Sequence, residues 1–352
     1  MPAIKHEYSF ETGVYRPPSE GGSSSLLLRF TRNCPWNKCA FCAMYKTEKF
    51  EIRPLDEIKS DIDSMAAIRD ELLELSGRRG EKAEIGGNAP ARFLGRHPEF
   101  EYHQGFVMLY HWLVAGGRTA FLQDANTLIM KTPDLVEALQ YLRNRFPSIQ
   151  RVTTYARSRT LAQKRPGDLK AIRQAGLNRL HIGLETGDDQ LLKKIGKGTD
   201  SQGHIKGGRR AVEAGFQVSE YWMPGLGGKE RWETHARQTA RVLSEINPHY
   251  IRSRPFRPLP GTPMHDEVQK GTFELLAPRQ QLRELELTME NLDVTSRVCF
   301  DHAGNYWRGP RGGLLLSHDY EGYEFPGQKQ QVIDRIRAGF DVEQRMPGFL
   351  RM

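Results

Sequence analysis

The stretch SLLLRFTRNCPWNKCAFC, which occupies residues 25–42, places an apolar run directly before a loop that holds three of the chain's four cysteines. A short, continuous apolar run is typical of a strand that is buried on both faces, as strands of parallel sheets are. We therefore expect a buried strand over Ser25 to Thr31, with the cysteine loop at its carboxyl end.

Further strand candidates follow this first one and alternate with helical patterns, of which Leu55 to Leu75 is the clearest. The candidates are Thr119 to Gln123, Arg151 to Tyr155, Asn178 to Glu185, Gln217 to Met223 and Tyr250 to Phe256. Alternation of strands and helices predicts an α/β fold with parallel βα units. Its order suggests a partial (β/α)6 TIM-like barrel, and such a barrel carries its site at the carboxyl ends of the strands.

Changes of composition divide the chain into three predicted parts. Residues 1–24 end in Gly, Ser and Pro and predict an extended lead-in, and residues 25–262 form the expected barrel. Within the barrel, residues 77–104 show no clear periodicity and predict a surface insertion that could act as a lid. Residues 263–352 predict a small C-terminal appendage. Its expected helices span Pro278 to Asp293 and Gln328 to Phe340.

The overall composition fits a folded chain without an obvious membrane segment. Hydrophobic residues make up 38% of the 352 residues, which excludes a wholly disordered chain. The N-terminus lacks the apolar segment of a signal peptide, and no apolar run reaches the length of a membrane span, so we expect a cytoplasmic protein. The net charge of +8 suits nucleic acid, acidic lipid or an anionic small molecule, but no dense basic run favours nucleic acid.

Three cysteines, Cys34, Cys39 and Cys42, lie within nine residues. In a reducing compartment clustered cysteines indicate metal binding rather than disulfides. Thiolates on a short loop can hold an iron–sulfur cluster, and three of them leave one iron open for a ligand. Zinc is the alternative, although a four-cysteine zinc site would need the distant Cys299. A chance grouping is the third reading.

The cysteine loop resembles that of radical S-adenosylmethionine (SAM) enzymes, whose usual spacing is C-x3-C-x2-C. Here four residues separate Cys34 from Cys39. The resemblance implies an oxygen-sensitive [4Fe-4S] cluster whose open iron binds SAM, and reductive cleavage of SAM to methionine and a 5′-deoxyadenosyl radical. It extends over Ser25 to Met264 and looks like the branch that contains oxygen-independent coproporphyrinogen III oxidase and its uncharacterised relatives.

The same resemblance implies SAM contacts near the start of the barrel. Phe41, just before the last cysteine of the loop, is expected to lie near the adenine. Asp124 and Asn126 stand where the family's Gly-Gly-Glu-type loop lies, and they could accept hydrogen bonds from the SAM ammonium group. The alternative is an ordinary turn at the end of a strand.

Later strand ends supply further candidates. Glu185 ends a strand that alternates between apolar and polar residues, so its carboxylate is expected to face the cavity and bind the SAM ribose; a salt bridge to an arginine is the alternative. Met223 opens a glycine-rich turn, and Phe256 resembles the family's adenine contact at the sixth strand. Arg157 could hold the SAM carboxylate.

Two further arginines, Arg252 and Arg254, predict a positive cavity mouth for an anionic substrate, although structural roles are equally open. Three functions follow from the resemblance. The first is a radical SAM enzyme that acts on an anionic small molecule and takes electrons from a flavodoxin or ferredoxin. The second is a radical SAM enzyme that modifies tRNA or another macromolecule. The third is a non-catalytic cluster-binding or tetrapyrrole-binding relative.

The loop does not specify whether the reaction is that of an oxidoreductase, a transferase or a lyase, and the sequence identifies no catalytic residue. Cys299 could be a thiol that takes part in radical chemistry or a small buried residue, and we favour the second reading.

Overall fold

The computed structural model describes residues 8–13, 20, 25–77 and 85–344. The chain divides into two compact units. The first unit comprises Met1–Pro35, Lys49–Tyr155 and Lys170–Arg179, and the second comprises Trp36–Glu48, Ala156–Leu169 and Leu180–Met352. We describe each unit by itself.

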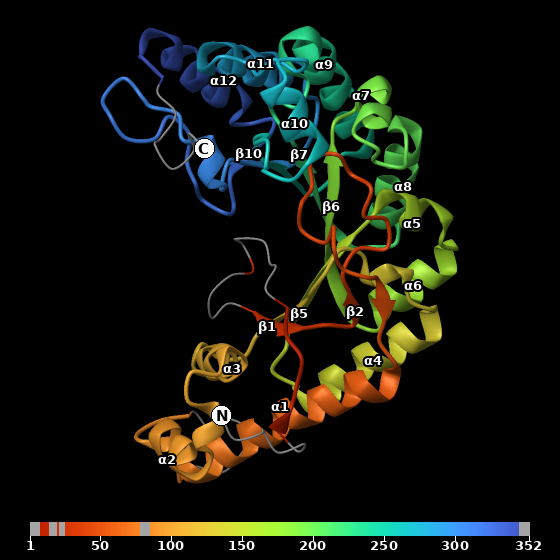
Figure 1. Cartoon of the computed structure of the whole chain (residues 1–352), viewed down its shortest axis with the longest axis vertical. Coiled ribbons are helices and arrows are strands. Elements are labelled where there is room, and N and C mark those ends of the chain that lie inside the picture. The colour runs from red at the N-terminus through yellow and green to blue at the C-terminus, as the bar shows by residue number, and fades with distance from the viewer. Residues whose placement is uncertain (1–7, 14–19, 21–24, 78–84, 345–352) are drawn as a thin grey trace. The chain divides into compact units, whose positions relative to one another are not determined.

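Three parallel strands form the sheet of the first unit (Figure 1). Strand β1 (Leu26–Leu28) pairs with β4 (Thr119–Leu122), and β4 pairs with β5 (Arg151–Ala156), so that Leu27 lies opposite Phe121 and Phe121 opposite Thr153. The leucines of β1 are all buried, as a strand covered on both faces requires. Strands β2 (Thr31–Arg32) and β3 (Glu51–Ile52) form a separate antiparallel pair on either side of the cysteine loop.

The helices of the first unit include α1 (Leu55–Leu75), which has the predicted bounds, and α4 (Thr132–Arg145), which packs against it. Of the predicted insertion, residues 78–84 lie outside the described residues. The remainder is helical: α2 (Ala89–Arg96), the 3₁₀ turn η3 (Pro98–Phe100) and the start of α3 (Gln104–Val114). Aromatic rings form its core, with Phe93 and Phe106 stacked at 4.9 Å. These elements are too short to give a clear sequence period.

Five strands of the second unit lie in the order β6-β7-β8-β9-β10. Strand β6 (Leu177–Glu185) enters from the first unit, and β7 (Gln217–Trp222), β8 (Tyr250–Ser253) and β9 (Arg297–Cys299) follow, with β7, β8 and β9 parallel to one another. Strand β10 (Tyr323–Glu324) is antiparallel to β9. The last two strands were not predicted.

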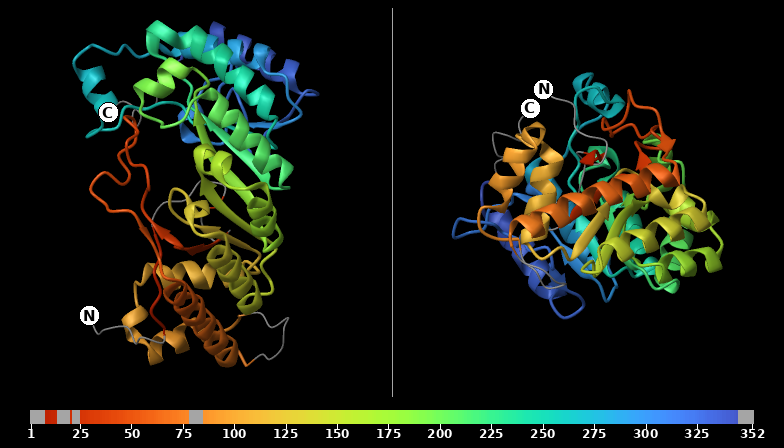
Figure 2. Two further views of the ribbon diagram at one scale, coloured as in Figure 1. Left: turned by 90° about the vertical axis from the view of Figure 1, so that its right-hand side faces the viewer. Right: turned by 90° about the horizontal axis from the view of Figure 1, so that it is seen from below.

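The helices of the second unit surround this sheet. They are α5 (Ser158–Gln163), α7 (Asp189–Lys194), α8 (Ser201–Glu213), α9 (Gly228–Ile246), α10 (Pro263–Gln269), α11 (Pro278–Asn291) and α12 (Lys329–Ala338), while α6 (Pro166–Gln174) belongs to both units. Helix α11 packs between α9 and α12, and these helices lie together at the top of the left view of Figure 2. Their apolar faces form one core with Leu184 and Trp222 of the strands, so the C-terminal segment is part of the second unit.

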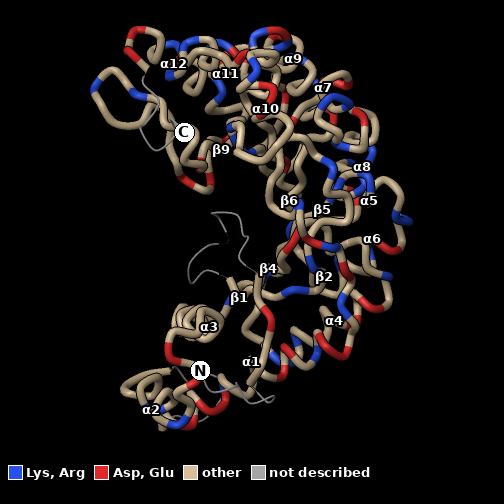
Figure 3. Tube along the Cα trace, viewed as in Figure 1, with Lys and Arg blue, Asp and Glu red and all other residues tan. Residues whose placement is uncertain are grey.

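The predicted α/β class with a mostly parallel sheet is confirmed, and all six predicted strands are present. The two C-terminal helices begin and end within two residues of their predicted bounds. The predicted domain boundaries after residues 24 and 262 stay predictions. Figure 3 shows charges of both signs interspersed along the described chain. No helix of the described residues is long and apolar enough to cross a membrane.

Candidate functional site

The start of the cysteine loop is fixed within the first unit. The backbone N–H of Asn33 donates to Oδ2 of Asp124 at 2.9 Å, and both residues adopt the left-handed backbone conformation, with φ of 68° and 69°. The same Oδ2 accepts from Nε of Arg29 at 2.8 Å, and Nη2 of Arg29 lies 2.7 Å from it. Asp124 is buried, with a side chain that is 1% exposed. The residue before Cys34 is therefore held by a buried carboxylate.

The middle of the loop is fixed within the second unit. The N–H of Ala40 donates to the carbonyl of Ile195 at 2.8 Å, and its carbonyl accepts from the N–H of Met264 at 3.1 Å. The N–H of Cys42 donates to the carbonyl of Cys39 at 3.3 Å, which forms the turn between the two cysteines. Backbone bonds on both sides of Ala40 thus hold the stretch that carries Cys39 and Cys42.

A buried ion pair lies beside this stretch. Glu185, the last residue of β6, accepts from Nζ of Lys197 at 2.7 Å, and the two side chains are 11% and 13% exposed. Gly183 makes room for the pair, because a Cβ on it would lie 2.1 Å from the Glu185 carboxylate. Glu185 has a φ of 64°, a conformation that non-glycine residues seldom adopt and that is concentrated at functional sites.

The charges of this pair act on the Cys39 thiol. Burial raises the pKa of Cys39; the positive charge of Lys197 works against this rise, and Glu185 adds to it. Burial by itself lowers the pKa of Lys197, but the charges of Glu185 and Cys39 outweigh burial, and the pKa is raised. Lys197 therefore stays protonated and places a positive charge near the Cys39 thiol.

Three of the predicted SAM contacts share one apolar cluster in the second unit. Phe41, Met223 and Phe256 pack in a group that also includes Ala40 and Met264. The remaining members of the cluster are Leu191, Ile195, Leu226, Val268 and Phe273. An apolar surface of this kind thus lies directly under the loop that carries Cys39 and Cys42.

The other predicted SAM contacts are placed differently. Arg157 is in the second unit, where its guanidinium lies 4.8 Å from the ring of Trp36 and donates to the carbonyl of Lys197 at 2.8 Å. Asp124 and Asn126 are both buried and belong to the first unit. A contact of Asp124 and Asn126 with SAM stays a prediction.

Arg252 of β8 and Arg254, which follows the strand, form a separate polar group. Arg252 and Arg254 both pair with the buried Asp301, at 3.2 and 3.1 Å. Arg254 also lies 4.7 Å above the ring of Tyr221, whose hydroxyl hydrogen-bonds to Nδ1 of His181 at 2.9 Å. Two guanidinium groups therefore share one buried carboxylate.

Cys299 is fully buried on β9. Its Sγ lies 3.4 Å from the carbonyl of Tyr320, and burial raises its pKa to about 12. The thiolate is therefore scarce at neutral pH, which supports the reading of a small buried residue. Burial together with the charge of Arg254 lowers the pKa of the neighbouring His302 to about 4, so this imidazole is neutral at pH 7.

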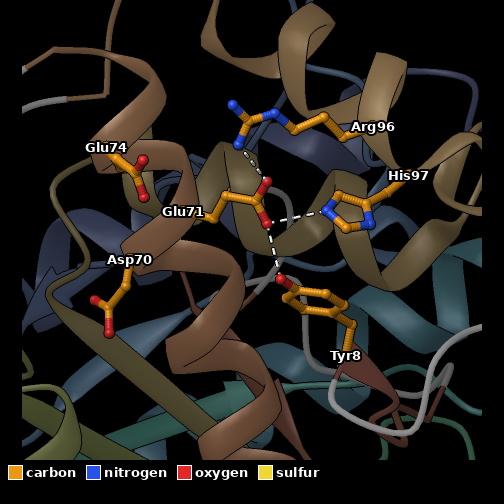
Figure 4. Close-up of a pocket in the computed structure, with 6 residues that line it drawn as sticks. All are labelled: Tyr8, Asp70, Glu71, Glu74, Arg96 and His97. Carbon is orange, nitrogen blue, oxygen red and sulfur yellow. Dashed lines mark hydrogen bonds and ion pairs between the residues drawn. The ribbon is translucent and has the colours of Figure 1, made fainter.

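A depression in the first unit is separate from these residues (Figure 4). At its centre Glu71 accepts from the Tyr8 hydroxyl at 2.8 Å and from Arg96 at 3.2 Å, and it lies 3.0 Å from Nε2 of His97. Burial raises the pKa of Glu71, but these hydrogen bonds outweigh burial and lower it. The contacts join the lead-in residue Tyr8 to α1 and α2, so we assign this group a structural role.

The donor set suits an iron–sulfur cluster chemically. Cys34, Cys39 and Cys42 are all reduced and partly exposed, and Lys197 offsets negative charge beside one of them. Cys34 belongs to the first unit and the other two to the second. Among the residues that the structure describes, no three His, Cys, Asp or Glu side chains are already grouped as metal ligands.

The sequence profile of the radical SAM superfamily matches residues 28–237, more than half of the chain. The chain belongs to the radical SAM superfamily. Members of this superfamily use a [4Fe-4S] cluster and SAM, so the cofactors expected from the cysteine loop are confirmed at the level of the family. The TIM-like barrel that the sequence predicted is also the fold of radical SAM enzymes.

Individual relatives of this radical SAM chain are distant. The heme chaperone HemW of Bacillus subtilis (strain 168) is 28% identical over 127 residues, which are 36% of this chain and 33% of HemW. The match thus spans a third of that relative's length. The match to HemW agrees with the predicted likeness to the coproporphyrinogen oxidase branch.

Two solved structures are similar at low identity. Methylornithine synthase (PylB) is 14% identical, with 92% of this chain and 75% of that chain covered, at a TM-score of 0.44. Coproporphyrinogen III oxidase (HemN) of Escherichia coli is 16% identical, with 72% and 48% covered, at a TM-score of 0.43. Both scores lie below 0.5, so the assignment to the superfamily rests on the profile match.

Two residues of the site were not predicted from the sequence. Lys197 lies in a Gly-Lys-Gly turn twelve residues after Glu185, and this turn was the available signal. Trp36 lies inside the cysteine loop itself, where a large aromatic residue in the lengthened spacing was the signal.

Proposed function

We propose that this chain is a radical SAM enzyme in which Cys34, Cys39 and Cys42 hold the [4Fe-4S] cluster, and that it acts on an anionic small molecule. One observation supports this proposal most: the buried pair of Glu185 and Lys197 lies beside the cysteine loop, with Nζ of Lys197 6.0 Å from the centre of the Phe41 ring. A carboxylate and an ammonium group held together next to a cluster thiol suit a ligand that carries both charges, as SAM does through its amino and carboxylate groups.

The chain's own residues would bind and orient SAM. Lys197 would pair with its carboxylate, and Glu185 would accept from its ribose hydroxyls or its ammonium group. Phe41, Met223 and Phe256 would cover the adenine and exclude water from it. When bound, the cluster would supply the electron that cleaves SAM, and an external donor such as a flavodoxin or ferredoxin would renew it.

Two arginines at the end of β8 support the proposal of an anionic substrate. Arg252 and Arg254 share Asp301 as their carboxylate partner, and Arg252 is 1% exposed. A substrate carboxylate would suit these two guanidinium groups, because guanidinium binds planar carboxylates through paired hydrogen bonds. Tyr221 and His181 would supply hydrogen-bonding groups beside it.

Anaerobic reconstitution tests the cluster. We expect the wild-type chain to take up iron and sulfide with a brown chromophore, and Cys34→Ala, Cys39→Ala and Cys42→Ala each to lose it. Cys299→Ala is the matched control and should keep it. Retained iron in all three loop variants would refute the assignment.

Cleavage of SAM tests the enzyme. We expect 5′-deoxyadenosine to form when the reconstituted chain receives SAM and a reductant. The similarity to HemW favours one second candidate, a non-catalytic protein that handles haem. A chain that holds its cluster and binds haem with a shifted Soret band, but releases no 5′-deoxyadenosine, would support that candidate and overturn the first.

A further inference from the structure

Trp36 lies between the first two cysteines, in the spacing that is one residue longer than usual. Its side chain turns toward the segment between α7 and α8: the indole Nε1–H donates to the carbonyl of Gly196 at 2.7 Å. Gly198 receives the ring closely, because a Cβ at this position would lie 2.3 Å from Cζ2 of Trp36. The indole is therefore fitted against the turn Gly196–Gly198 by one hydrogen bond and by the absence of a side chain.

Two arginines of the second unit hold the same pair of segments together. The guanidinium groups of Arg157 and Arg159 lie 4.8 and 6.0 Å from the Trp36 ring. The same groups donate to the carbonyls of the turn, Arg157 to Lys197 at 2.8 Å and Arg159 to Gly198 at 3.2 Å. Each arginine thus contacts both the ring and the turn, through a cation–π contact on one side and a hydrogen bond on the other.

The turn that receives Trp36 carries Lys197, whose ammonium group pairs with Glu185 at 2.7 Å. The indole therefore connects the cysteine loop to the residues that would bind SAM. Trp36 is one of the four residues between Cys34 and Cys39, where the usual spacing has three.

We propose that Trp36 is a positioning residue that fixes Lys197 and the cysteine loop relative to each other. The proposal deepens the function proposed above and rests on it, because Lys197 matters here as a ligand of SAM. Trp36 touches neither reactant in this role; it sets where the Lys197 ammonium group stands. Removal of the indole should therefore raise the dissociation constant for SAM while the melting temperature changes little.

The experiment uses the reconstituted chain under anaerobic conditions and measures the equilibrium dissociation constant for SAM, the iron content and the melting temperature. We expect Trp36→Ala to raise the dissociation constant for SAM about tenfold or more. A loss of about 10- to 100-fold in affinity is found when residues that orient metal ligands are removed, and we expect a positioning residue for SAM to act on the same scale. Trp36→Phe keeps an aromatic ring but loses the Nε1–H donor, and it should fall between the alanine variant and the wild type. Trp232→Ala, a partly buried tryptophan of α9, is the control and should bind SAM as the wild type does.

A double-mutant cycle separates positioning from general damage. Gly198→Ala should weaken SAM binding by displacing the indole, and it also strains a backbone with φ of +77°. The strain is present in both backgrounds and cancels in the cycle. We therefore expect Trp36→Ala/Gly198→Ala to bind SAM no more weakly than the worse of the two single variants.

Several outcomes would overturn the proposal. A dissociation constant for Trp36→Ala within twofold of the wild type, at equal iron content, would do so, and so would fully additive effects in the cycle. If Trp36→Ala does not fold, the dissociation constant of Trp36→Phe for SAM is compared with that of the wild type instead, and a value within twofold overturns the proposal. Failure of the wild type to hold iron or to bind SAM would overturn the proposed function instead, so the two failures are distinguishable.

Discussion

Asn33, which precedes Cys34, and Ala40, which follows Cys39, are both held through backbone atoms, but by different kinds of partner. The first unit holds Asn33 through the carboxylate of Asp124, which pairs with Arg29, and Arg29 in turn pairs with Glu11. The second unit holds Ala40 through two backbone hydrogen bonds above an apolar cluster.

The difference matters because charge and packing respond to different conditions. An ion pair weakens with salt and with protonation of its carboxylate. Apolar burial is almost insensitive to both, since no charge is involved. We therefore expect the start of the loop to respond more strongly to salt, and through Glu11 to pH, than its middle does.

The largest effect is expected for Asp124→Ala. The substitution leaves the Asn33 N–H and the Arg29 guanidinium without their shared acceptor in a buried place. Removal of one partner of a buried pair costs about 3 kcal/mol or more, and we expect the lower end, because the Arg29 side chain keeps 17% exposure. Urea unfolding of the cluster-free chain measures the loss.

Asp124→Asn sharpens this result. It keeps one carbonyl oxygen as an acceptor for the Asn33 N–H but removes the charge that faces Arg29, so its loss should be smaller than that of Asp124→Ala. A loss below about 1 kcal/mol for the alanine variant, the value of one ordinary hydrogen bond, would contradict the view that this carboxylate fixes the start of the loop.

An intermediate effect is expected for Met264→Ala in the second unit. Met264 is fully buried in the apolar cluster under the loop. Its truncation leaves a cavity and should cost about 2 kcal/mol or more. The loss in urea unfolding should be the same at low and high salt and at pH 5 and pH 8, because no charge changes.

Met264→Leu is the control for cavity formation, since it keeps most of the buried volume and should cost less than about 1.5 kcal/mol. If the loss of unfolding free energy for Met264→Ala varies strongly with salt or pH, the distinction between the start and the middle of the loop is wrong.

The comparison also shows what could be predicted from the sequence. Helix α1 was predicted with its observed bounds because Ile58, Ile62, Met65 and Leu72 repeat at helical spacing, and all four are buried. Strands β9 and β10 were missed because three and two residues are too few to show a period.

At the site, chain position predicted which residues lie at strand ends, but not which of them meet. Phe41, Met223 and Phe256 were named separately, and the structure groups them. Lys197 was missed because its contact with Glu185 depends on the turn between α7 and α8, and no local sequence pattern predicts such a tertiary contact. That the Asp124 carboxylate also binds Arg29 and Asn33 could not be predicted, because both contacts depend on the tertiary fold; its contact with SAM stays a prediction.

The smallest effect is expected for Glu11→Gln. The direction in which its effect on the unfolding free energy changes with pH tests the charged contacts at the start of the loop. Burial raises the pKa of Glu11, but its bonds to Arg32, Arg53 and Arg29 outweigh burial and lower it from 4.5. A lowered pKa contributes stability above the unfolded value and loses it as pH falls through the folded value. Glu11→Gln should therefore cost about 1 kcal/mol in urea unfolding at pH 7, and the difference from the wild type should shrink below about pH 4.

Glu51→Gln is the control. It removes a half-exposed partner of the same Arg32 and should cost less than about 0.5 kcal/mol. A cost for Glu11→Gln that grows as the pH falls would reverse the assigned sign and remove the basis for pH control at the start of the loop.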